Sequence, residues 1–161
     1  MATAPEDTLV MELPSGRVII ALRPDLAPNH VARVKELVRD GFYDGLAFHR
    51  VIDGFMAQTG CPQGTGTGGS GRKLKAEFSN TPFKRGTIGA ARTQDPNSAD
   101  SQWFICFGDA SWLNGQYTVW GEVVEGMEAV DGLSKAPASD PSGSVPKPDK
   151  IVSIKVQADA A

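Results

Sequence analysis

Residues 48–60 read FHRVIDGFMAQTG and have the pattern of a β-hairpin. Phe48 to Ile52 is rich in the aromatic and β-branched residues that favour strands. Asp53-Gly54 is a strong turn signal, because glycine tolerates the positive φ angles of tight hairpin turns. Phe55 to Gln58 then has the composition to begin a second strand. The sequence therefore predicts two antiparallel strands joined at Asp53-Gly54.

Such a hairpin would bring Arg50 and Gln58 to either side of its turn. If both side chains share a face with Phe55 and Met56, they form a shallow apolar surface with one fixed cation, one amide and no general base. The same residues also fit a purely structural interpretation. Phe55 and Met56 would then be core, Arg50 would lay its stem on apolar neighbours, and Gln58 would be solvated. The hairpin alone leaves both interpretations open.

The composition is that of an ordinary globular protein. The chain has 161 residues, 40% of them hydrophobic and 22% charged, so we expect a single domain over residues 1–161 with a sizeable core. A net charge of −3 gives no electrostatic reason to expect binding to nucleic acid or to an anionic membrane. The 18 glycines and 11 prolines favour short strands joined by turns over a helical bundle.

The chain shows no targeting or redox signature. Residues 1–7, MATAPED, lack the basic start of a signal peptide, and no apolar run approaches the roughly 20 residues needed to span a bilayer. We therefore expect a soluble cytoplasmic protein. Cys61 and Cys106 form neither a disulfide framework nor a metal quartet, and we expect both to be bystanders. We expect no metal and no cofactor.

Strand-like and helix-like runs alternate with turn signals along the whole chain. One helix should run from Asn29, with Pro28 near its start and Gly41 just past its end, and a shorter one is expected around Met127, Val130 and Leu133. The loop over residues 136–150 should return the chain to its own sheet. The fold class predicted is mostly β, a closed eight-stranded antiparallel barrel capped by two α-helices. Runs typical of strands lie at residues 8–13, 17–22, 48–52, 55–58, 72–78, 86–91, 102–107, 117–123 and 151–157, from which we expect about seven or eight short strands in the sheet.

A glycine-rich segment, GTGTGGSG at residues 64–71, matches a dinucleotide fingerprint as a text pattern. Gly66, Gly68 and Gly71 supply its three glycines. The fingerprint needs a helix after it, but residues 72–78 alternate like a short strand. The hypothesis of a nucleotide-dependent oxidoreductase rests only on this weak pattern. The segment is interpreted instead as a loop at the rim of the site.

Three motifs together resemble the cyclophilins, the peptidyl-prolyl cis-trans isomerases. They are FHRVIDGFMAQTG, then SQWFI at residues 101–105, then WLNG at residues 112–115. The resemblance covers nearly the whole chain, and residues 65–78 and 91–104 look more like bacterial members than animal ones. It implies an enzyme that rotates X-Pro peptide bonds and assists protein folding. Its partners would be proline-containing peptides and unfolded or flexible protein segments, and the protein would be a monomer.

The resemblance also implies a role for each matching residue. Arg50 would be the catalytic arginine, and Gln58 would help to place the substrate backbone. Tyr117 stands where many members have a pocket histidine, and Thr93 lies in a loop that is one residue longer than usual. Trp112 matches the rim tryptophan associated with cyclosporin binding. The substrate-binding residues expected are Phe55, Met56, Thr93, Gln102, Phe104, Trp112, Leu113 and Tyr117.

A competing interpretation is a proline-segment binding module or chaperone with incidental turnover. The presence of Arg50 favours the enzyme, because a pure binder has no need of that donor. Phe48, Trp103 and Trp120 are expected in the core rather than in the pocket, and His49 is expected to be a hydrogen-bonded structural residue.

Overall fold

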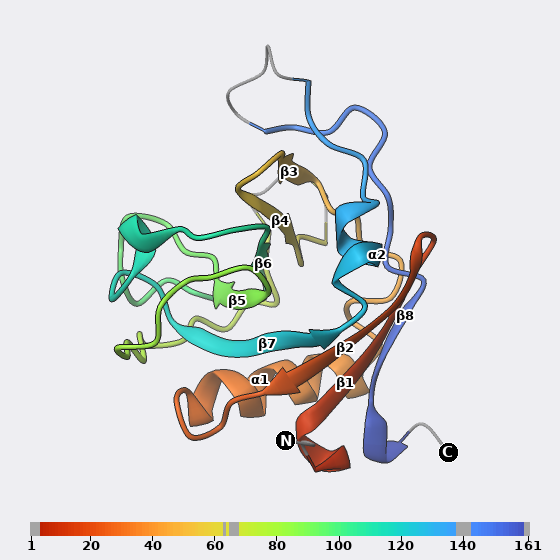
Figure 1. The fold of residues 1–161 in the computed structure, drawn as a ribbon. Helices are drawn as coiled ribbons and strands as arrows, with labels where there is room; N and C mark the ends of the chain where they lie inside the picture. The colour runs from red at the N-terminus through yellow and green to blue at the C-terminus, as the bar shows by residue number, and fades with distance from the viewer. Residues whose placement is uncertain (1–3, 63, 65–67, 138–142, 160–161) are drawn as a thin grey trace.

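The computed structural model describes residues 4–62, 64, 68–137 and 143–159. One sheet of eight strands dominates it, with neighbouring strands antiparallel in the order β3-β4-β6-β5-β7-β2-β1-β8 (Figure 1). The strands are β1 (Thr8–Leu13), β2 (Gly16–Leu22), β3 (Arg50–Ile52), β4 (Met56–Thr59), β5 (Thr87–Ala90), β6 (Trp103–Cys106), β7 (Val119–Glu125) and β8 (Ser153–Val156). The helices are α1 (Pro28–Arg39) and α2 (Met127–Asp131), with 3-10 turns η1 (Pro5–Asp7), η2 (Ser111–Leu113) and η3 (Gln157–Asp159).

The mostly β class, the eight antiparallel strands and the two helices are confirmed, but the predicted closure of the barrel is not. Among the described residues no strand ladder joins β3 to β8, so the sheet is a curled half-barrel. Backbone hydrogen bonds instead join β3 and the residues just before it to the segment over residues 143–150, which precedes β8: Val51 N–H donates to Gly143 O at 3.0 Å, and Phe48 N–H donates to Asp149 O at 2.9 Å. Pro146 and Pro148 interrupt this segment, and proline cannot donate to a ladder.

Helix α1 has the ends that its sequence predicts. Pro28 occupies the first turn, where its missing N–H costs nothing, and Gly41 follows the helix with φ of +73°. Its buried face comprises His30, Val31, Val34, Leu37 and Val38. The helix packs against β7 and β8, while α2 packs against β2. No helix formed by the described residues combines the length and the apolar character needed to cross a bilayer.

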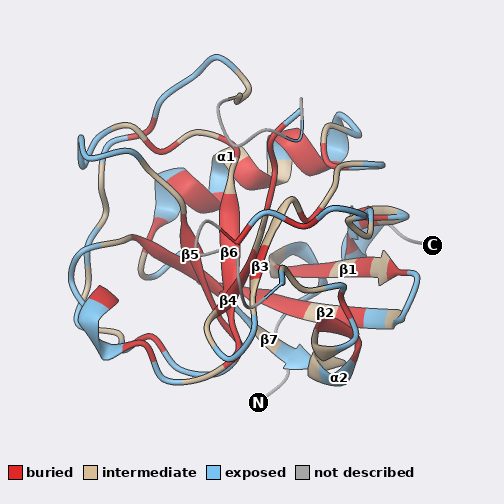
Figure 2. Cartoon of the chain, turned by 90° about the horizontal axis from the view of Figure 1, so that it is seen from above, coloured by how far each residue is buried: buried red, intermediate tan, exposed pale blue. Residues whose placement is uncertain are grey.

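Strand β6 divides the interior into two clusters of buried side chains. Successive side chains of a strand point to opposite faces, so Trp103 and Ile105 enter the main core while Phe104 and Cys106 enter a smaller cluster. Both faces are covered, and every residue of β5 and β6 is buried (Figure 2). Antiparallel sheets commonly leave one face to solvent, whereas here the second face is covered by the smaller cluster.

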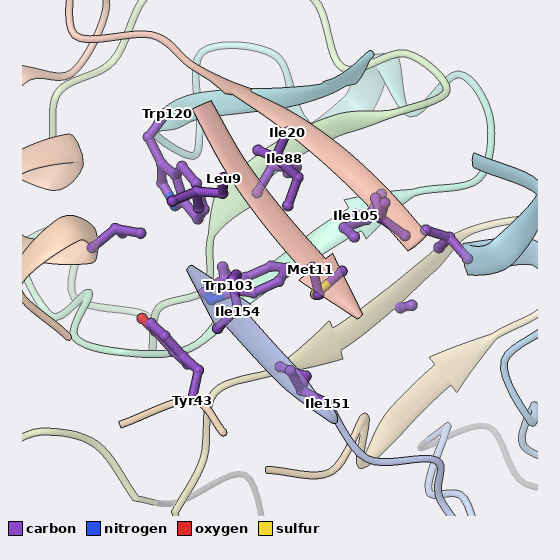
Figure 3. Close-up of a cluster of buried hydrophobic side chains, with 14 of the residues drawn as sticks. Leu9, Met11, Ile20, Tyr43, Ile88, Trp103, Ile105, Trp120, Ile151 and Ile154 are labelled. Atoms are coloured by element: carbon purple, nitrogen blue, oxygen red, sulfur yellow. The ribbon is translucent and has the colours of Figure 1, made fainter. Parts of the chain in front are cut away.

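Aromatic rings meet edge to face in the main core. The ring of Trp103 lies 6.0 Å from that of Tyr43, 6.2 Å from that of Phe48 and 5.7 Å from that of Trp120. All four side chains are almost fully buried, and Figure 3 shows Trp103 and Trp120 among aliphatic side chains from several strands. The prediction that Phe48, Trp103 and Trp120 belong to the core is therefore confirmed.

Residues 72–78 are not the short strand that their alternation suggests. Only Leu74 pairs, in an isolated bridge with Ala99. Asn97 Oδ1 accepts the backbone N–H of Ala76 at 3.0 Å, which takes the place of a ladder bond. Gly66 of the glycine-rich pattern lies outside the described residues.

Candidate active site

The β3–β4 hairpin sets the polar edge of the site. Arg50 and Gln58 are direct cross-strand partners, and Gly54 makes the turn between them with φ of +76°. Arg50 Nη1 donates to Gln58 Oε1 at 3.2 Å, and Gln58 Nε2 donates to Gln102 Oε1 at 2.9 Å. Gln102 Nε2 in turn donates to Gly68 O at 2.9 Å. A chain of amides therefore fixes the guanidinium from one side without adding a charge.

Beside this edge lies a first hollow of about 130 Å³. The structure brings seven of the predicted site residues around it, together with two that sequence reasoning missed, Ala91 and Arg92. Its lining is Arg50, Phe55, Met56, Gln58, Ala91, Arg92, Phe104, Leu113 and Tyr117. No carboxylate lines it among the described residues, and its lining combines apolar side chains with two cations, Arg50 and Arg92.

Phe104 forms an aromatic wall that is supported from behind. Its ring stacks on that of Phe83 with centroids 5.8 Å apart, and it meets the Tyr117 ring edge to face at 5.7 Å. Gly89 provides the room, because a Cβ there would lie 2.7 Å from Phe83 Cε2 and 2.8 Å from Phe104 Cζ. Phe83 and Gly89 were also missed by sequence reasoning, since neither is part of a site motif.

Thr93 and Gln102 lie outside the first hollow and line a second one of about 450 Å³ next to it. The two hollows share Gln58, Ala91 and Arg92. The lining of the second hollow is Gln58, Gly68, Gly69, Lys73, Ala91, Arg92, Thr93, Ser98, Asp100 and Gln102. Most of its lining residues carry polar side chains, and its cations and amides suit a peptide backbone or polar side chains.

Trp112 lines neither hollow. Its side chain is 64% exposed on η2, and its ring centroid lies 5.5 Å from that of Phe55. Phe55 belongs to the first hollow, so the indole stands beside the rim, where it can contact a ligand larger than a proline ring.

The two cysteines and His49 line neither hollow. Burial raises the pKa of the Cys106 thiol to about 12, so this thiol stays protonated at neutral pH. Cys61 is also buried. Both ring nitrogens of His49 are buried without a hydrogen-bond partner among the described residues, which differs from the expected hydrogen-bonded histidine. Burial lowers the pKa of His49, the backbone of Ala47 opposes this shift, and the nearby Arg50 charge lowers the pKa further.

Residues 8–156 match the family model described as cyclophilin type peptidyl-prolyl cis-trans isomerase/CLD. The chain belongs to the cyclophilins. Curated bacterial relatives carry the activity in their names. The chain is 54% identical to a probable peptidyl-prolyl cis-trans isomerase of Brucella suis over 98% of this chain and 86% of that protein. It is 40% identical to a peptidyl-prolyl cis-trans isomerase of Synechococcus elongatus over 94% of this chain and 97% of that protein.

Solved cyclophilins share the fold. A cyclophilin from Hirschia baltica superposes with a TM-score of 0.86 at 27% identity, over 100% of this chain and 77% of that one. A cyclophilin-type isomerase from Cryptosporidium parvum, studied in the presence of the dipeptide Ala-Pro, gives a TM-score of 0.85 at 28% identity over 92% of this chain and 98% of that one. The predicted family and its class of enzyme, peptidyl-prolyl cis-trans isomerase, are confirmed.

Proposed function

We propose that this cyclophilin rotates X-Pro peptide bonds by a hydrogen bond from Arg50 to the proline nitrogen while the first hollow holds the proline ring. Amide resonance gives the uncatalysed rotation a barrier of about 18–20 kcal/mol and a time of tens to hundreds of seconds. Turnover in roughly milliseconds requires a barrier lower by about 7 kcal/mol, because each factor of ten in rate is worth about 1.4 kcal/mol. Rotation makes and breaks no covalent bond, so stabilising the twisted amide is enough.

Arg50 is suited to this task because the change in the transition state is electronic. As the amide twists, the proline nitrogen becomes pyramidal and regains a lone pair that can accept a hydrogen bond. A guanidinium is always protonated at physiological pH and is rigidly planar. Its hydrogen bond to Gln58 Oε1 fixes its direction before substrate arrives, and fixed donors of this kind favour a transition state over a ground state.

The apolar part of the first hollow supports the proposal. Phe55, Met56, Phe104 and Leu113 contribute hydrocarbon to its lining, which fits a pyrrolidine ring better than a charged side chain. If the site holds the proline ring still while the preceding carbonyl rotates, binding energy can be used to lower the barrier to rotation about the X-Pro bond. Gln58 is placed to hold the substrate backbone without adding a charge. Proline-containing peptides and flexible protein segments are the substrates that this geometry favours.

The observation that carries the proposal is the position of Arg50, which lines the first hollow together with apolar side chains and is bound to a neutral amide. Arg50→Ala should lower turnover about a hundredfold, equivalent to about 2.7 kcal/mol, without unfolding the protein. Exchange NMR on a short Ala-Pro peptide measures this directly. Arg50→Lys is the matched variant, because it keeps the charge but loses the planar donor fork, and its activity should be intermediate.

A folded Arg50→Ala variant with near wild-type exchange rates would show that another group supplies the donor. If the wild-type protein itself left the exchange rate at its spontaneous value, the chain would be a proline-segment binding module instead. Assistance to folding is checked separately, by refolding a protein whose slow phase is prolyl isomerisation.

Four further predictions accompany the proposed function. The protein acts as a monomer of one domain in the cytoplasm, and it binds cyclosporin. Sedimentation velocity checks the monomer, limited proteolysis checks the single domain, and cell fractionation checks the location.

A further inference from the structure

Arg92 lies where the two hollows meet, and many contacts hold its guanidinium in place. Nε and Nη2 both donate to Gln116 O, at 2.9 and 2.8 Å, and Nη1 donates to Thr93 O at 2.8 Å and to Gln94 O at 3.4 Å. The guanidinium carbon stands 4.6 Å from the centroid of the Tyr117 ring. A charged group with this many contacts keeps one position relative to both hollows.

Every one of these partners is neutral. Carbonyl oxygens and an aromatic ring orient the cation but do not cancel its charge, and no carboxylate forms an ion pair with Arg92 among the described residues. An arginine carries five N–H donors, and these contacts use four, which leaves one Nη2 hydrogen without a partner in the described structure. Arg92 is therefore an oriented cation that retains one donor.

The charges around the two hollows do not balance either. Arg50, Arg92 and Lys73 contribute three cations, while Asp100 contributes one carboxylate. Asp100 already accepts hydrogen bonds from the backbone N–H groups of Ser70 and Gly71 and from the Ser70 hydroxyl. The whole chain has a net charge of −3, so the site is a positive area on a negative molecule. Such an area attracts negative groups and repels positive ones.

We propose that Arg92 selects substrates with an acidic side chain near the isomerising proline. With the proline ring in the first hollow, a glutamate or aspartate within two residues of it pairs with the guanidinium of Arg92. An extended chain advances about 3.3–3.6 Å per residue, so residues one or two positions away from the proline reach the adjacent second hollow. This inference rests on the proposed function, because it requires the proline ring to occupy the first hollow.

The test compares peptides that differ only in charge. Glutamate or lysine is placed at each of the two positions before and the two positions after the proline, and kcat/KM is measured by exchange NMR for every peptide. At one position or more, the wild-type protein should favour glutamate over lysine by about fivefold to tenfold, as expected for a partly exposed ion pair and the matching repulsion. Arg92→Gln should reduce this ratio to less than about twofold, and Arg92→Lys should retain part of it.

Arg17→Gln is the matched control, because it removes one arginine charge that is paired with Glu12 on another part of the surface. It should leave the glutamate-to-lysine ratio unchanged. A structural defect in an Arg92 variant would lower kcat/KM for all peptides together and would leave the glutamate-to-lysine ratio unchanged. Wild-type protein provides a test without substitution: the ratio should shrink as ionic strength rises from about 0.01 M to about 1 M, where the Debye length falls from about 30 Å to about 3 Å.

Equal turnover of glutamate and lysine peptides at all four positions would overturn the inference and leave the proposed isomerase intact. A preference that survives in folded Arg92→Gln, or one that is insensitive to salt, would overturn it as well. If folded wild-type protein turned over none of the peptides, the proposed function would fail, and the inference with it.

Discussion

Phe104 has two roles at once, since its ring forms a wall of the first hollow and belongs to the smaller buried cluster. Phe104→Ala should therefore lower both activity and stability, the latter by about 3–5 kcal/mol, as for other buried phenylalanines. Phe83→Ala is the matched variant, because Phe83 stacks on Phe104 and is equally buried but does not line the hollow. Urea denaturation should show a similar loss of stability for Phe83→Ala, while its turnover should fall less than that of Phe104→Ala. Equal losses of turnover in the two variants would mean that Phe104 acts only through packing.

Trp112 should affect a large ligand more than a small one. The indole is exposed beside Phe55, so it can donate its N–H to a ligand carbonyl and cover apolar surface, whereas the proposed place of the proline ring is the adjacent hollow. Trp112→Ala should weaken cyclosporin binding tenfold or more, about 1.4 kcal/mol, with a smaller effect on the turnover of short peptides. Titration calorimetry checks the affinity. Equal affinities of the wild type and the variant would remove Trp112 from the binding surface.

At the scale of single residues, the sequence predicted those that belong to motifs and missed those that act through space. Arg50 and Gln58 were found because a two-stranded turn makes them neighbours, and they are direct cross-strand partners. Arg92 was missed because an arginine after a strand has no local signal, and its position beside the hollows depends on carbonyls and a ring up to 25 residues away along the chain. Phe83 and Gly89 were missed for the same reason.

Helix α1 depends on a residue far away in the sequence for its N-terminal cap. Ala27, at the cap position, offers no side-chain hydrogen bond. Glu77 replaces it: its carboxylate accepts the backbone N–H of Asn29 at 3.2 Å and that of His30 at 2.8 Å, and it also lies 2.6 Å from His30 Nδ1. A carboxylate at a helix N-terminus also has a favourable interaction with the helix dipole. One side chain thus joins α1 to the segment over residues 72–80.

Glu77→Ala should destabilise the protein by about 2 kcal/mol or more, because it removes a cap worth about 1 kcal/mol and leaves the buried His30 Nδ1 without a partner. Glu77→Gln should cost less, since its amide oxygen can still accept one backbone N–H. Urea denaturation measures both free energies of unfolding. If Glu77→Ala unfolded at the wild-type urea concentration, the cap would contribute nothing to stability.

This capping contact also explains why the element at residues 72–78 was predicted wrongly. Alternating polar and apolar residues favour a strand only where a partner strand is available. Here the polar residues are used elsewhere, Glu77 at the start of α1 and the Ala76 N–H on Asn97. The strands at residues 8–13 and 17–22 were predicted well because their partners are adjacent in the chain and the turn between them is local.

Across the whole molecule, the arrangement of strands was harder to predict than their number. Local patterns gave the class and the eight strands, but the two sheet edges, β3 and β8, are about 100 residues apart in the chain, and no local signal specifies whether they pair. Prolines in the segment before β8 favour irregular contacts over a ladder. The resulting opening lies at β3, the strand that carries Arg50, so the half-barrel leaves that strand free of a second regular partner among the described residues.

The pH dependence of stability is also a property of the whole molecule, because both histidines of the chain contribute to it in the same direction. Burial lowers the pKa of His30, although Glu77 opposes this, and burial lowers the pKa of His49 as well. Below the ordinary histidine pKa of 6.5 the unfolded chain therefore binds more protons than the folded protein. The stabilisation is fully present above pH 6.5 and is lost as the pH falls toward the lowered folded-state values.

The free energy of unfolding should therefore decrease on acidification from about pH 7.5 to about pH 5.5, before the carboxylates begin to titrate near their ordinary values of about 4. Urea denaturation at several pH values measures the slope. His49→Phe provides the comparison, because it removes one of the two groups that prefer to be neutral in the folded state while still filling its space. Its slope should be shallower than that of the wild type. A wild-type stability that is constant or rising over this range on acidification would mean that both imidazoles accept protons in the folded protein as readily as in the unfolded chain.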